Sequence, residues 1–286
     1  MKPISGTTKV VGIIGNPIEH SLSPIMHNAA YKALNLDYVY IPMKIEAEDL
    51  PKTMDEIRTS NMAGVNVTIP HKENVLPLLD DITELAELIG AVNTIENREG
   101  KLIGYNTDGS GFLDSLKQEA HFDPKGKDCV LLGAGGAAKA VSIMLAKEKA
   151  KSLLICDIDQ EKAQSLVEHL SNNFDVKVSA CPPKDEKLAK AIKDCQLLIN
   201  ATPIGMHPKI KACPLDEKIK IPENILVYDL IYTPAETQLL QKAKKAGAKT
   251  MNGAEMLVRQ GALAFTIFTG ENAPLDIMRQ TLFNNL

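Results

Sequence analysis

Short apolar runs alternate with segments of helical periodicity along most of the chain. In the first hundred residues the apolar runs predict strands over 10–15, 37–45 and 64–69. The amphipathic stretches between and after them predict helices over 24–35, 49–61, 73–82 and 83–90. A turn signal at Glu99-Gly100 predicts a hairpin over 93–106. This alternation is typical of an α/β fold, with a mostly parallel sheet covered by helices on both faces.

The second half of the chain repeats the alternation after a break. A helix predicted over 110–120 ends in the breaker HFDPKGKD, and further strands are predicted over 129–132, 152–157, 177–180, 195–200, 224–230 and 248–251. Two apolar-faced helices are predicted for the tail, over 253–270 and 273–286. A length of 286 residues favours two domains.

A glycine-rich stretch directly follows the first of these later strands, which is predicted over 129–132. The apolar run Val130–Leu132 stops at Gly133, Gly135 and Gly136 follow, and helix-forming residues begin at Ala137. Such a strand, turn and helix can bring a pyrophosphate close to the backbone and to the positive end of the helix dipole. A glycine-bearing turn of any α/β domain is the alternative.

An acidic residue after the next strand favours the dinucleotide interpretation. Asp157 follows the apolar run SLLIC and lies 21 residues after Gly136. An acid about 20 residues beyond the glycines accepts hydrogen bonds from the adenosine ribose in dinucleotide-binding folds. Asp157 could instead cap the following helix, although Asp159 offers a competing cap.

Composition narrows the class of protein. The chain is 44% hydrophobic and 24% charged, with a net charge of −4, so a nucleic-acid partner is not expected. It has no apolar run of about 18 residues and no signal-peptide core, so no membrane contact is expected. Five scattered cysteines without a CxxC pattern favour reduced thiols in a cytoplasmic protein and no metal site.

Polar residues collect where the first and third strands are predicted to end. Ser21 and Ser23 precede a helix and could bind a carboxylate, or Ser23 could simply cap the helix. Asn66 and Thr68 lie near the end of the third strand and Lys72 follows it, although a lysine just past a strand end is ordinarily a solvated surface residue. Ligands bind at the carboxyl ends of strands in open α/β sheets, so these residues are candidates for a site.

A third polar stretch follows the predicted hairpin. Asn106 and Asp108 stand just before a helix, where Asp108 could serve as its N-cap. Ser110 offers a competing cap, which would leave the Asp108 carboxylate available for chemistry.

Eight motifs, in this order and spacing, resemble those of the shikimate dehydrogenase family. They are SLSP (21–24), NVTIPHK (66–72), GAVNT (90–94), GYNTDGSGF (104–112), GAGGAA (133–138), NATPIGM (200–206), DLIYTPAET (229–237) and NGAEMLVRQGALAF (252–265). The resemblance extends from about Val10 to Gly270. It implies a two-domain α/β fold: a substrate-binding catalytic domain over 1–108, completed by the helices of 253–286, and a Rossmann-type NAD(P) domain over 109–252. It also implies an active-site cleft between the two domains.

The resemblance also assigns residues by position. It implies a catalytic pair of Lys72 and Asp108, and a substrate carboxylate site at Ser21 and Ser23. It further implies substrate contacts at Thr68, Lys72, Asn93, Asp108, Tyr232 and Gln260. The cofactor positions that it implies are Gly133, Ala134, Gly135, Gly136, Ala137, Asp157, Thr202, Leu230 and Gly253, with Glu84 as a further polar position.

The chemistry of the implied reaction agrees with this pair. Oxidation of a secondary alcohol needs a base for the hydroxyl proton while hydride leaves for the nicotinamide. A lysine is a poor base at neutral pH unless it is desolvated, and a nearby Asp108 favours its ammonium form. We therefore interpret Lys72 and Asp108 as a coupled pair that bridges substrate hydroxyls. His71 is expected to point away from Lys72.

The implied activity is the reversible interconversion of shikimate and 3-dehydroshikimate in aromatic amino-acid biosynthesis. The stretch from Cys156 to Asp159 holds two acids, and no arginine precedes Lys162, so NAD is expected to be preferred and NADP remains possible. One alternative is a quinate/shikimate dehydrogenase that uses NAD mainly for quinate. A non-catalytic dinucleotide-sensing relative is disfavoured because Lys72 and Asp108 are both present. A homodimer is possible.

Overall fold

The chain divides into two compact units. The computed structural model describes residues 2–60 and 62–286. Unit 1 contains the residues up to Gly111 together with Leu257–Asn285, and unit 2 contains Phe112–Met256. The chain passes between the units within helices α4 (Thr107–Gln118) and α9 (Ala254–Thr269). The functional boundaries expected from the sequence, at 108/109 and 252/253, depend on which ligand each part binds and stay a prediction.

Unit 1 is built on a six-stranded mixed sheet. Its strands are β1 (Lys9–Gly15), β2 (Tyr38–Lys44), β3 (Met62–Val67), β4 (Asp81–Ile82), β5 (Thr94–Arg98) and β6 (Lys101–Tyr105), in the order β2-β1-β3-β5-β6-β4. β1 pairs in parallel with β2 and β3, whereas β5 pairs antiparallel with β3 and β6. The hairpin is confirmed, with positive φ at Glu99 and Gly100. It makes the sheet mixed, with three of its five described pairings parallel, in agreement with the predicted mostly parallel sheet.

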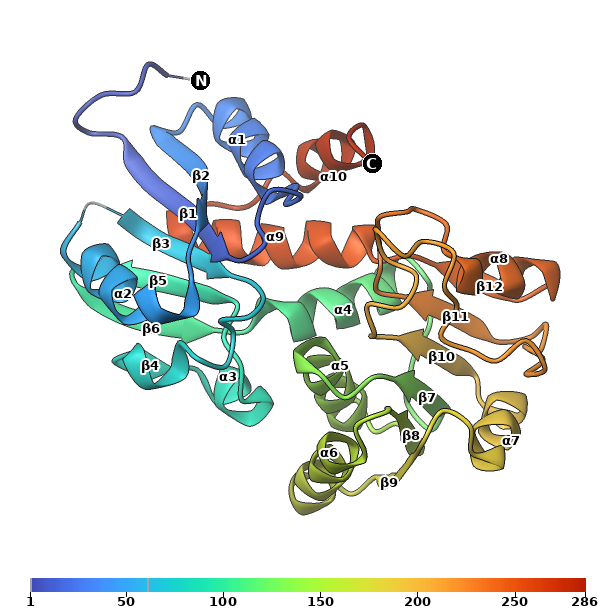
Figure 1. Cartoon of the computed structure of the whole chain (residues 1–286). Helices are drawn as coiled ribbons and strands as arrows, with labels where there is room; N and C mark the ends of the chain where they lie inside the picture. Colours follow the sequence, from blue (N-terminus) through green and yellow to red (C-terminus); the bar gives the residue numbers. More distant parts are fainter. Residues whose placement is uncertain (1, 61) are drawn as a thin grey trace. The chain divides into compact units, whose positions relative to one another are not determined.

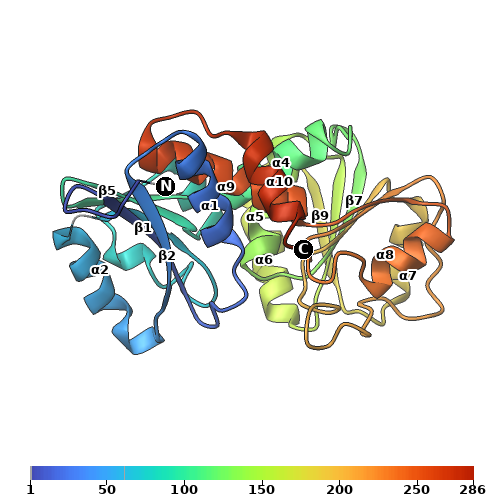
Figure 2. The same cartoon turned by 90° about the horizontal axis from the view of Figure 1, so that it is seen from above.

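Helices cover both faces of this sheet (Figures 1 and 2). They are α1 (Ser23–Ala33), α2 (Leu50–Thr59), α3 (Glu84–Ile89), α9 and α10 (Leu275–Phe283), with short 3-10 turns at Ala47–Asp49 and Leu76–Leu78. Leu50, Met54 and Ile57 of α2 pack with strand residues in one apolar core. On the other face Tyr31 of α1 stacks on Phe265 of α9, with ring centroids 5.3 Å apart. Each face is therefore buried by its own helices, as amphipathic periodicity requires.

Unit 2 is a doubly wound parallel sheet. Its strands are β7 (Asp128–Leu132), β8 (Ser152–Cys156), β9 (Lys177–Cys181), β10 (Leu197–Asn200), β11 (Leu226–Asp229) and β12 (Lys249–Met251), in the order β12-β11-β10-β7-β8-β9. Every pairing is parallel, and the order reverses between β7 and β10. This is the Rossmann order, which binds ligands at the carboxyl ends of the strands beside the reversal.

Helices also cover both faces of the second sheet. They are α5 (Gly136–Lys147), α6 (Gln160–Asn173), α7 (Glu186–Asp194) and α8 (Gln238–Lys245). Figures 1 and 2 show α5 and α6 on one face and α7 and α8 on the other. Leu188 and Ile192 of α7 and Leu239 of α8 join one apolar core with β7, β10 and β11. The predicted strands of this half are confirmed.

Three elements depart from the sequence predictions. The helix expected over 73–82 is instead a 3-10 turn followed by β4, because Pro77 interrupts the helix and Asp80 bonds the backbone of Leu102. The helix expected over 49–61 ends at Thr59, and its predicted last residue, Asn61, lies outside the described residues. The helix expected over 110–120 begins earlier, at Thr107, so Asp108 lies in its first turn.

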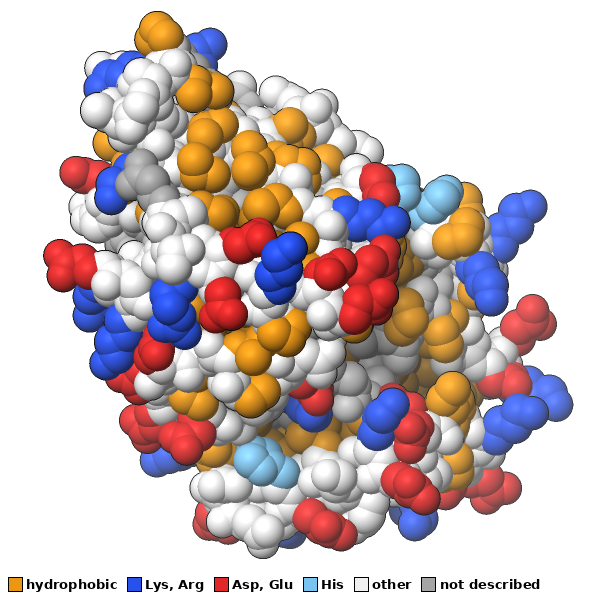
Figure 3. Space-filling view, turned by 60° about the vertical axis from the view of Figure 1, so that its left-hand side comes forward, with side chains coloured by type: hydrophobic (Ala, Val, Ile, Leu, Met, Phe, Trp, Pro, Cys, Tyr) orange, Lys and Arg blue, Asp and Glu red, His pale blue; other side chains and the backbone are white. Residues whose placement is uncertain are grey.

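Charged side chains of both signs lie on the face of the molecule that Figure 3 draws. On the face drawn in Figure 3, acidic and basic side chains are interspersed and neither sign forms an extended area. None of the described helices combines the length and the apolar character that crossing a bilayer demands.

Candidate active site and cofactor site

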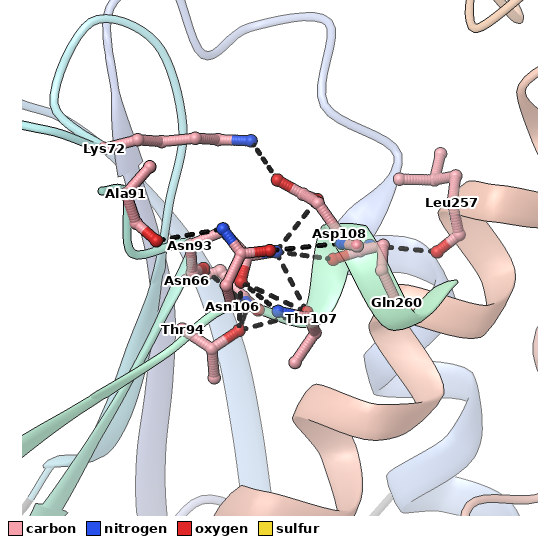
Figure 4. A network of polar contacts seen from close by, with 11 residues as sticks. Asn66, Lys72, Ala91, Asn93, Thr94, Asn106, Thr107, Asp108, Leu257 and Gln260 are labelled. Atoms are coloured by element: carbon pink, nitrogen blue, oxygen red, sulfur yellow. Dashed lines mark hydrogen bonds and ion pairs between the residues drawn. The ribbon is translucent and has the colours of Figure 1, made fainter. Parts of the chain in front are cut away.

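An ion pair between Lys72 and Asp108 forms the centre of the polar residues in unit 1 (Figure 4). Lys72 Nζ donates to Asp108 Oδ2 over 2.6 Å, and the two side chains are only 24% and 13% exposed. Lys72 follows the turn after β3, where its carbonyl accepts a bond of 2.8 Å from the Val92 N–H. Asp108 lies in the first turn of α4, where the helix dipole favours a negative charge.

Asn93 holds the Asp108 carboxylate in place. Its Nδ2 donates to Asp108 Oδ1 and to Thr107 Oγ1, each over 2.9 Å, and its Oδ1 accepts the Thr107 N–H over 2.7 Å. Asn93 is 3% exposed, so these bonds form away from bulk water. Asn93 thus fixes the start of α4 together with the buried Asn106, whose Oδ1 accepts the Gly109 N–H over 3.1 Å. Asp108 is a first-turn residue whose carboxylate faces Lys72, which removes the capping interpretation.

A second buried amide extends this support across the sheet. Asn66 Nδ2 donates to the Asn93 carbonyl over 3.1 Å and to Thr94 Oγ1 over 2.9 Å, and its Oδ1 accepts the Tyr40 hydroxyl over 2.7 Å. Burial and the neighbouring Tyr31 raise the pKa of Tyr40 well above its usual value, and a bond with Ser23 acts in the opposite direction. Buried polar groups joined in this way order a site strongly.

Tyr40, Thr94 and Thr107 were not predicted as site residues, and Asn66 was predicted only as a polar residue near the end of the third strand. Asn66, Thr94 and Thr107 lie in recognised motifs, and Tyr40 lies in β2, but their roles arise from side-chain bonds between strands. The available signal was a polar residue on a buried strand, as at Asn66 within GVNV. Such a residue must find a partner, because an unbonded buried amide is costly.

The other predicted substrate residues of unit 1 lie near these groups in the fold. Ser23 is the buried first residue of α1, and Ser21 Oγ accepts its N–H over 3.4 Å. Thr68 follows β3, and its N–H donates to the Ile14 carbonyl of adjacent β1 over 2.9 Å. Gln260 of α9 approaches Asn93 at 3.5 Å. Because β1 and β3 are parallel neighbours, the residues after them share one edge of the sheet.

His71 has a partner of its own. One ring nitrogen, Nε2, lies 2.8 Å from the Ile45 carbonyl, and the ring is fully buried. Its neighbour Lys72 is bonded to Asp108 instead. The two side chains therefore have different partners. The turn over residues 68–72 directs them apart, and strand alternation does not, because β3 already ends at Val67.

The glycine-rich loop of unit 2 presents bare backbone. Gly133 has φ +109°, and a Cβ there would lie 3.1 Å from the Ala201 carbonyl, so the tight turn requires glycine. A Cβ at Gly135 or Gly136 would meet nothing within 4 Å. Gly135 is the N-cap of α5 and supplies no side-chain cap, so the first N–H groups of the helix are available. This open cradle fits the pyrophosphate of a dinucleotide.

Asp157 is tied directly to this loop. Its Oδ2 accepts the Ala134 N–H over 2.6 Å, and its Oδ1 accepts the Asp159 N–H over 2.8 Å. Asp159 caps α6 by accepting the Lys162 N–H over 3.1 Å, and that bond lowers the pKa of its carboxyl. Of the two acids, Asp159 is therefore the cap. The adjacent Ile158 is 83% exposed.

The remaining predicted cofactor positions follow β10, β11 and β12. Thr202 Oγ1 donates to Asn200 Oδ1 over 2.7 Å, and the Leu230 N–H donates to the Asn200 carbonyl over 2.9 Å. A Cβ at Gly253 would lie 2.0 Å from the Leu230 carbonyl, so only glycine allows this approach. The predicted substrate residue Tyr232 belongs to the same unit, where burial raises the pKa of its phenol.

Comparison with known proteins adds family matches to this geometry. Residues 13–95 match the family described as shikimate dehydrogenase substrate binding domain, and residues 253–283 match the shikimate 5'-dehydrogenase C-terminal domain. Residues 129–251 match a saccharopine dehydrogenase NADP binding domain. The matches cover both units.

Whole-length relatives agree. The chain is 46% identical to a shikimate dehydrogenase (NADP(+)) of Desulforamulus reducens, over 98% of this chain and 96% of that protein. It is similar to a crystal structure of shikimate 5-dehydrogenase from Listeria monocytogenes in complex with shikimate and NAD, with 38% identity, 99% of both chains covered and a TM-score of 0.93. A quinate dehydrogenase from Corynebacterium glutamicum in complex with NAD gives 32% identity, 98% and 99% coverage and a TM-score of 0.89.

Proposed function

Because the chain belongs to the shikimate dehydrogenase family, we propose that it interconverts shikimate and 3-dehydroshikimate with a nicotinamide cofactor, a step of aromatic amino-acid biosynthesis. The observation that carries this proposal is the 2.6 Å pair of Lys72 and Asp108, supported by the buried Asn93. A partly exposed lysine bonded to a fixed carboxylate can exchange a proton with a hydroxyl placed beside both.

The proposed mechanism gives each residue of unit 1 one task. Lys72 receives the proton of the reacting hydroxyl, and Asp108 orients that hydroxyl and stabilises the ammonium that forms. The nicotinamide, when bound, accepts the hydride. Asn93 keeps the carboxylate at a fixed position, so the ionic pair needs little rearrangement during the reaction.

The substrate is held by further polar groups. We assign the substrate carboxylate to Ser21 and Ser23, whose hydroxyls lie at the start of α1, where the helix dipole favours an anion. We assign the ring hydroxyls to Thr68, Asn93 and Gln260. A hydroxyl of the substrate that is left without these partners would cost binding energy, which makes them a source of selectivity.

In the same proposal unit 2 binds the cofactor. Gly135 and Gly136 would hold the pyrophosphate, Asp157 would accept hydrogen bonds from the ribose hydroxyls, and Thr202, Leu230 and Gly253 would contact the nicotinamide end. Residues 1–108 and 253–286 then make up the substrate domain, and residues 109–252 the cofactor domain. Tyr232 completes the list of substrate contacts.

We further propose that NAD is preferred over NADP. A 2′-phosphate beside Asp157 would meet a like charge, and the exposed Ile158 stands where a cationic side chain could otherwise bind it. The relative from Desulforamulus reducens is named for NADP(+), whereas the Listeria monocytogenes structure holds NAD. Both cofactors therefore occur among similar proteins, and the local charge at Asp157 favours NAD in this chain.

We propose shikimate as the better substrate, with measurable turnover of quinate. Quinate adds a hydroxyl on the carbon that carries the carboxylate, so this hydroxyl must fit beside Ser21, Ser23 and Tyr232. Both serines are present, which favours the flatter ring of shikimate, but pockets reject an added hydroxyl only by about 10²-fold. A cytoplasmic location and a possible homodimer belong to the same proposal; the five cysteines are free thiols.

A two-by-two assay tests the proposal. Initial rates are measured for shikimate and quinate, each with NAD and with NADP, and compared as kcat/KM. We expect the highest value for shikimate with NAD and a lower, measurable value for quinate with NAD. No turnover of either acid would overturn the enzyme assignment. A higher value with NADP would overturn only the interpretation of Asp157, and a higher value for quinate only the substrate ranking.

A further inference from the structure

A fully buried carboxylate ends strand β11. Asp229 is 0% exposed, and three neutral groups donate to it. Asn200 Nδ2 and the Ile231 N–H reach Oδ1 over 2.9 and 3.1 Å, and Thr237 Oγ1 reaches Oδ2 over 2.6 Å. These bonds satisfy the carboxylate geometrically, but none of them carries a compensating charge.

The described part of the chain gives Asp229 no ion-pair partner. Among the described residues, no Lys, Arg or His lies within ion-pair distance of its carboxylate. Burial raises the pKa of Asp229 above its usual value, although the bonds from Thr237, Ile231 and Asn200 act in the opposite direction. An uncompensated buried charge costs several kcal/mol, and a neutral amide could accept and donate similar bonds at lower cost. The carboxylate therefore requires an explanation beyond packing.

Its place in the sheet suggests the explanation. Leu132, Asn200 and Asp229 are in register at the carboxyl ends of β7, β10 and β11, so the carboxylate shares an edge with the glycine-rich loop. The residues that directly follow β10 and β11 include Thr202 and Leu230, which the proposed function assigns to the nicotinamide end. The Asp229 side chain is also linked to Thr202 through Asn200.

The cofactor itself supplies a charge that changes during the reaction. The oxidised nicotinamide ring carries a positive charge, and the reduced ring is neutral. A fixed anion in a medium of low dielectric constant interacts with the first form much more strongly than with the second. The cost of burying Asp229 is then offset whenever oxidised cofactor is bound.

We propose that Asp229 is an electrostatic residue of the cofactor site that favours the cationic, oxidised nicotinamide over the neutral, reduced one. This inference rests on the proposed function, because it requires a nicotinamide dinucleotide at the carboxyl edge of the second sheet. On the enzyme, the charge shifts the equilibrium toward oxidised cofactor and hydroxyl substrate. It therefore favours reduction of the ketone.

Equilibrium binding tests the inference without catalysis. Dissociation constants of NAD⁺, NADH and ADP-ribose are measured by titration calorimetry for the unmodified protein and for Asp229→Asn, and the NADP pair is used if the unmodified protein prefers it. We expect Asp229→Asn to weaken NAD⁺ about fivefold or more, because one charge is lost in a poorly screened site. NADH and ADP-ribose should change by less than about twofold.

Matched variants separate charge from structure. Ser115→Ala removes a buried hydrogen bond of 2.7 Å to Tyr228 in the same unit, so it should lower stability without changing the NAD⁺/NADH ratio of dissociation constants. Asn200→Asp combined with Asp229→Asn moves the carboxylate to the adjacent strand end and should restore most of the ratio. If Asp229→Asn fails to fold, Asp229→Ser provides a second neutral variant.

The outcomes distinguish a failure of the charge inference from a failure of the proposed function. If the unmodified protein binds all three ligands but a neutral variant weakens them equally, or changes none, the charge inference is wrong and the proposed function stands. If the unmodified protein binds neither cofactor pair, the proposed function fails and the inference fails with it.

Discussion

The candidate site of unit 1 and that of unit 2 are formed by different kinds of group, side chains in the first and mainly backbone in the second. In unit 1 the candidate site consists of side chains bonded to other side chains, with Lys72, Asp108, Asn93 and Asn66 in one connected network. In unit 2 the candidate cofactor site is largely backbone: a glycine-rich turn, uncapped helix N–H groups and the close approach of Gly253 to the Leu230 carbonyl. Asp157 adds a charged side chain that bonds the glycine-rich loop.

This difference predicts how each site responds to substitution. A side-chain network loses its function when one member is removed, because the remaining groups are left unpaired or misplaced. A backbone cradle survives most substitutions outside its glycines, and its selectivity is set by the few side chains at its rim. Single substitutions in unit 1 should therefore reduce the rate, and those in unit 2 should mainly change which cofactor is used.

The largest effect is expected from loss of the lysine. Lys72→Ala should lower kcat by roughly 10²–10⁴-fold, the usual contribution of a general acid–base group, while KM changes much less. Asp108→Asn should act similarly, since it removes charge at nearly constant shape. Steady-state kinetics with shikimate measures both, and Lys101→Ala, which breaks an exposed pair with Asp81, is the matched control. A Lys72→Ala enzyme that kept most of its kcat would contradict the assignment.

The same contrast explains what the sequence could predict. Buried strands and amphipathic helices have local patterns, so the periodicity located nearly all the elements of both units. β4 was missed because its two residues are defined by pairing with β6, a contact that no local pattern records. The hairpin was recognised, but its consequence, a mixed sheet, depends on where the hairpin pairs.

The candidate sites show the same limit. Motifs identified Lys72 and Asp108, but the bond between them and the amide that supports Asp108 depend on the three-dimensional structure. Sequence reasoning also left two roles open for Asp157. The structure shows that Asp159 caps α6, since it accepts the Lys162 N–H, and the ribose contact of Asp157 stays a prediction. The buried charge of Asp229 gave no signal, because an acid at a strand end is ordinary in sequence.

The next largest effect is expected at Asp157 and Ile158, beside the glycine-rich loop of the candidate cofactor site. Asp157→Ser with Ile158→Arg removes the acid and supplies a bidentate partner for a 2′-phosphate. We expect the NAD/NADP ratio of kcat/KM to fall by about 10²-fold, because one repulsive contact is lost and one attractive contact is gained. Asp159→Ala tests the other acid: it should lower the melting temperature by removing a cap and leave the ratio unchanged. If Asp159→Ala alone changed cofactor preference, the roles of the two acids would have to be exchanged.

A smaller effect is expected from the second amide of unit 1. Asn66→Ala removes the bonds to the Tyr40 hydroxyl, the Asn93 carbonyl and Thr94 Oγ1, which should cost about 1–3 kcal/mol of stability. Since Asn93 also holds Asp108, we expect kcat/KM to fall about tenfold. Urea unfolding and steady-state kinetics measure the two effects separately.

Asn97→Ala is a matched control for that variant. Asn97 lies in β5, three residues after Thr94. Like Asn66, it makes three hydrogen bonds, in this case to Ile57, Met62 and Gly100. It should lower stability by a similar amount and leave kcat/KM unchanged. An equal loss of activity in both variants would mean that activity follows overall stability rather than support of the Lys72–Asp108 pair.

The smallest effect is expected from His27, a buried histidine of unit 1. His27 is fully buried and stacks on Tyr40 with ring centroids 4.4 Å apart, and among the described residues neither ring nitrogen has a hydrogen-bond partner. Burial lowers the pKa of His27 to about 3. Between pH 6.5 and about 3 the unfolded chain therefore binds a proton that the folded chain does not, so stability is lost as the pH falls through this range.

His27→Phe should keep the ring stacking and remove this proton. We expect the variant to match the unmodified protein above pH 7 and to lose less stability on acidification, by up to about 1.4 kcal/mol per pH unit below 6.5. Urea unfolding at pH 7.5, 6 and 5 measures the slope, and His121→Asn, at an exposed position with φ 51°, is the control. Because His27 lies outside the Lys72–Asp108 network, kcat at pH 7.5 should stay within twofold. An unchanged pH slope in His27→Phe would show that this histidine does not titrate on unfolding, and a large loss of kcat would place the stacked ring inside the catalytic network.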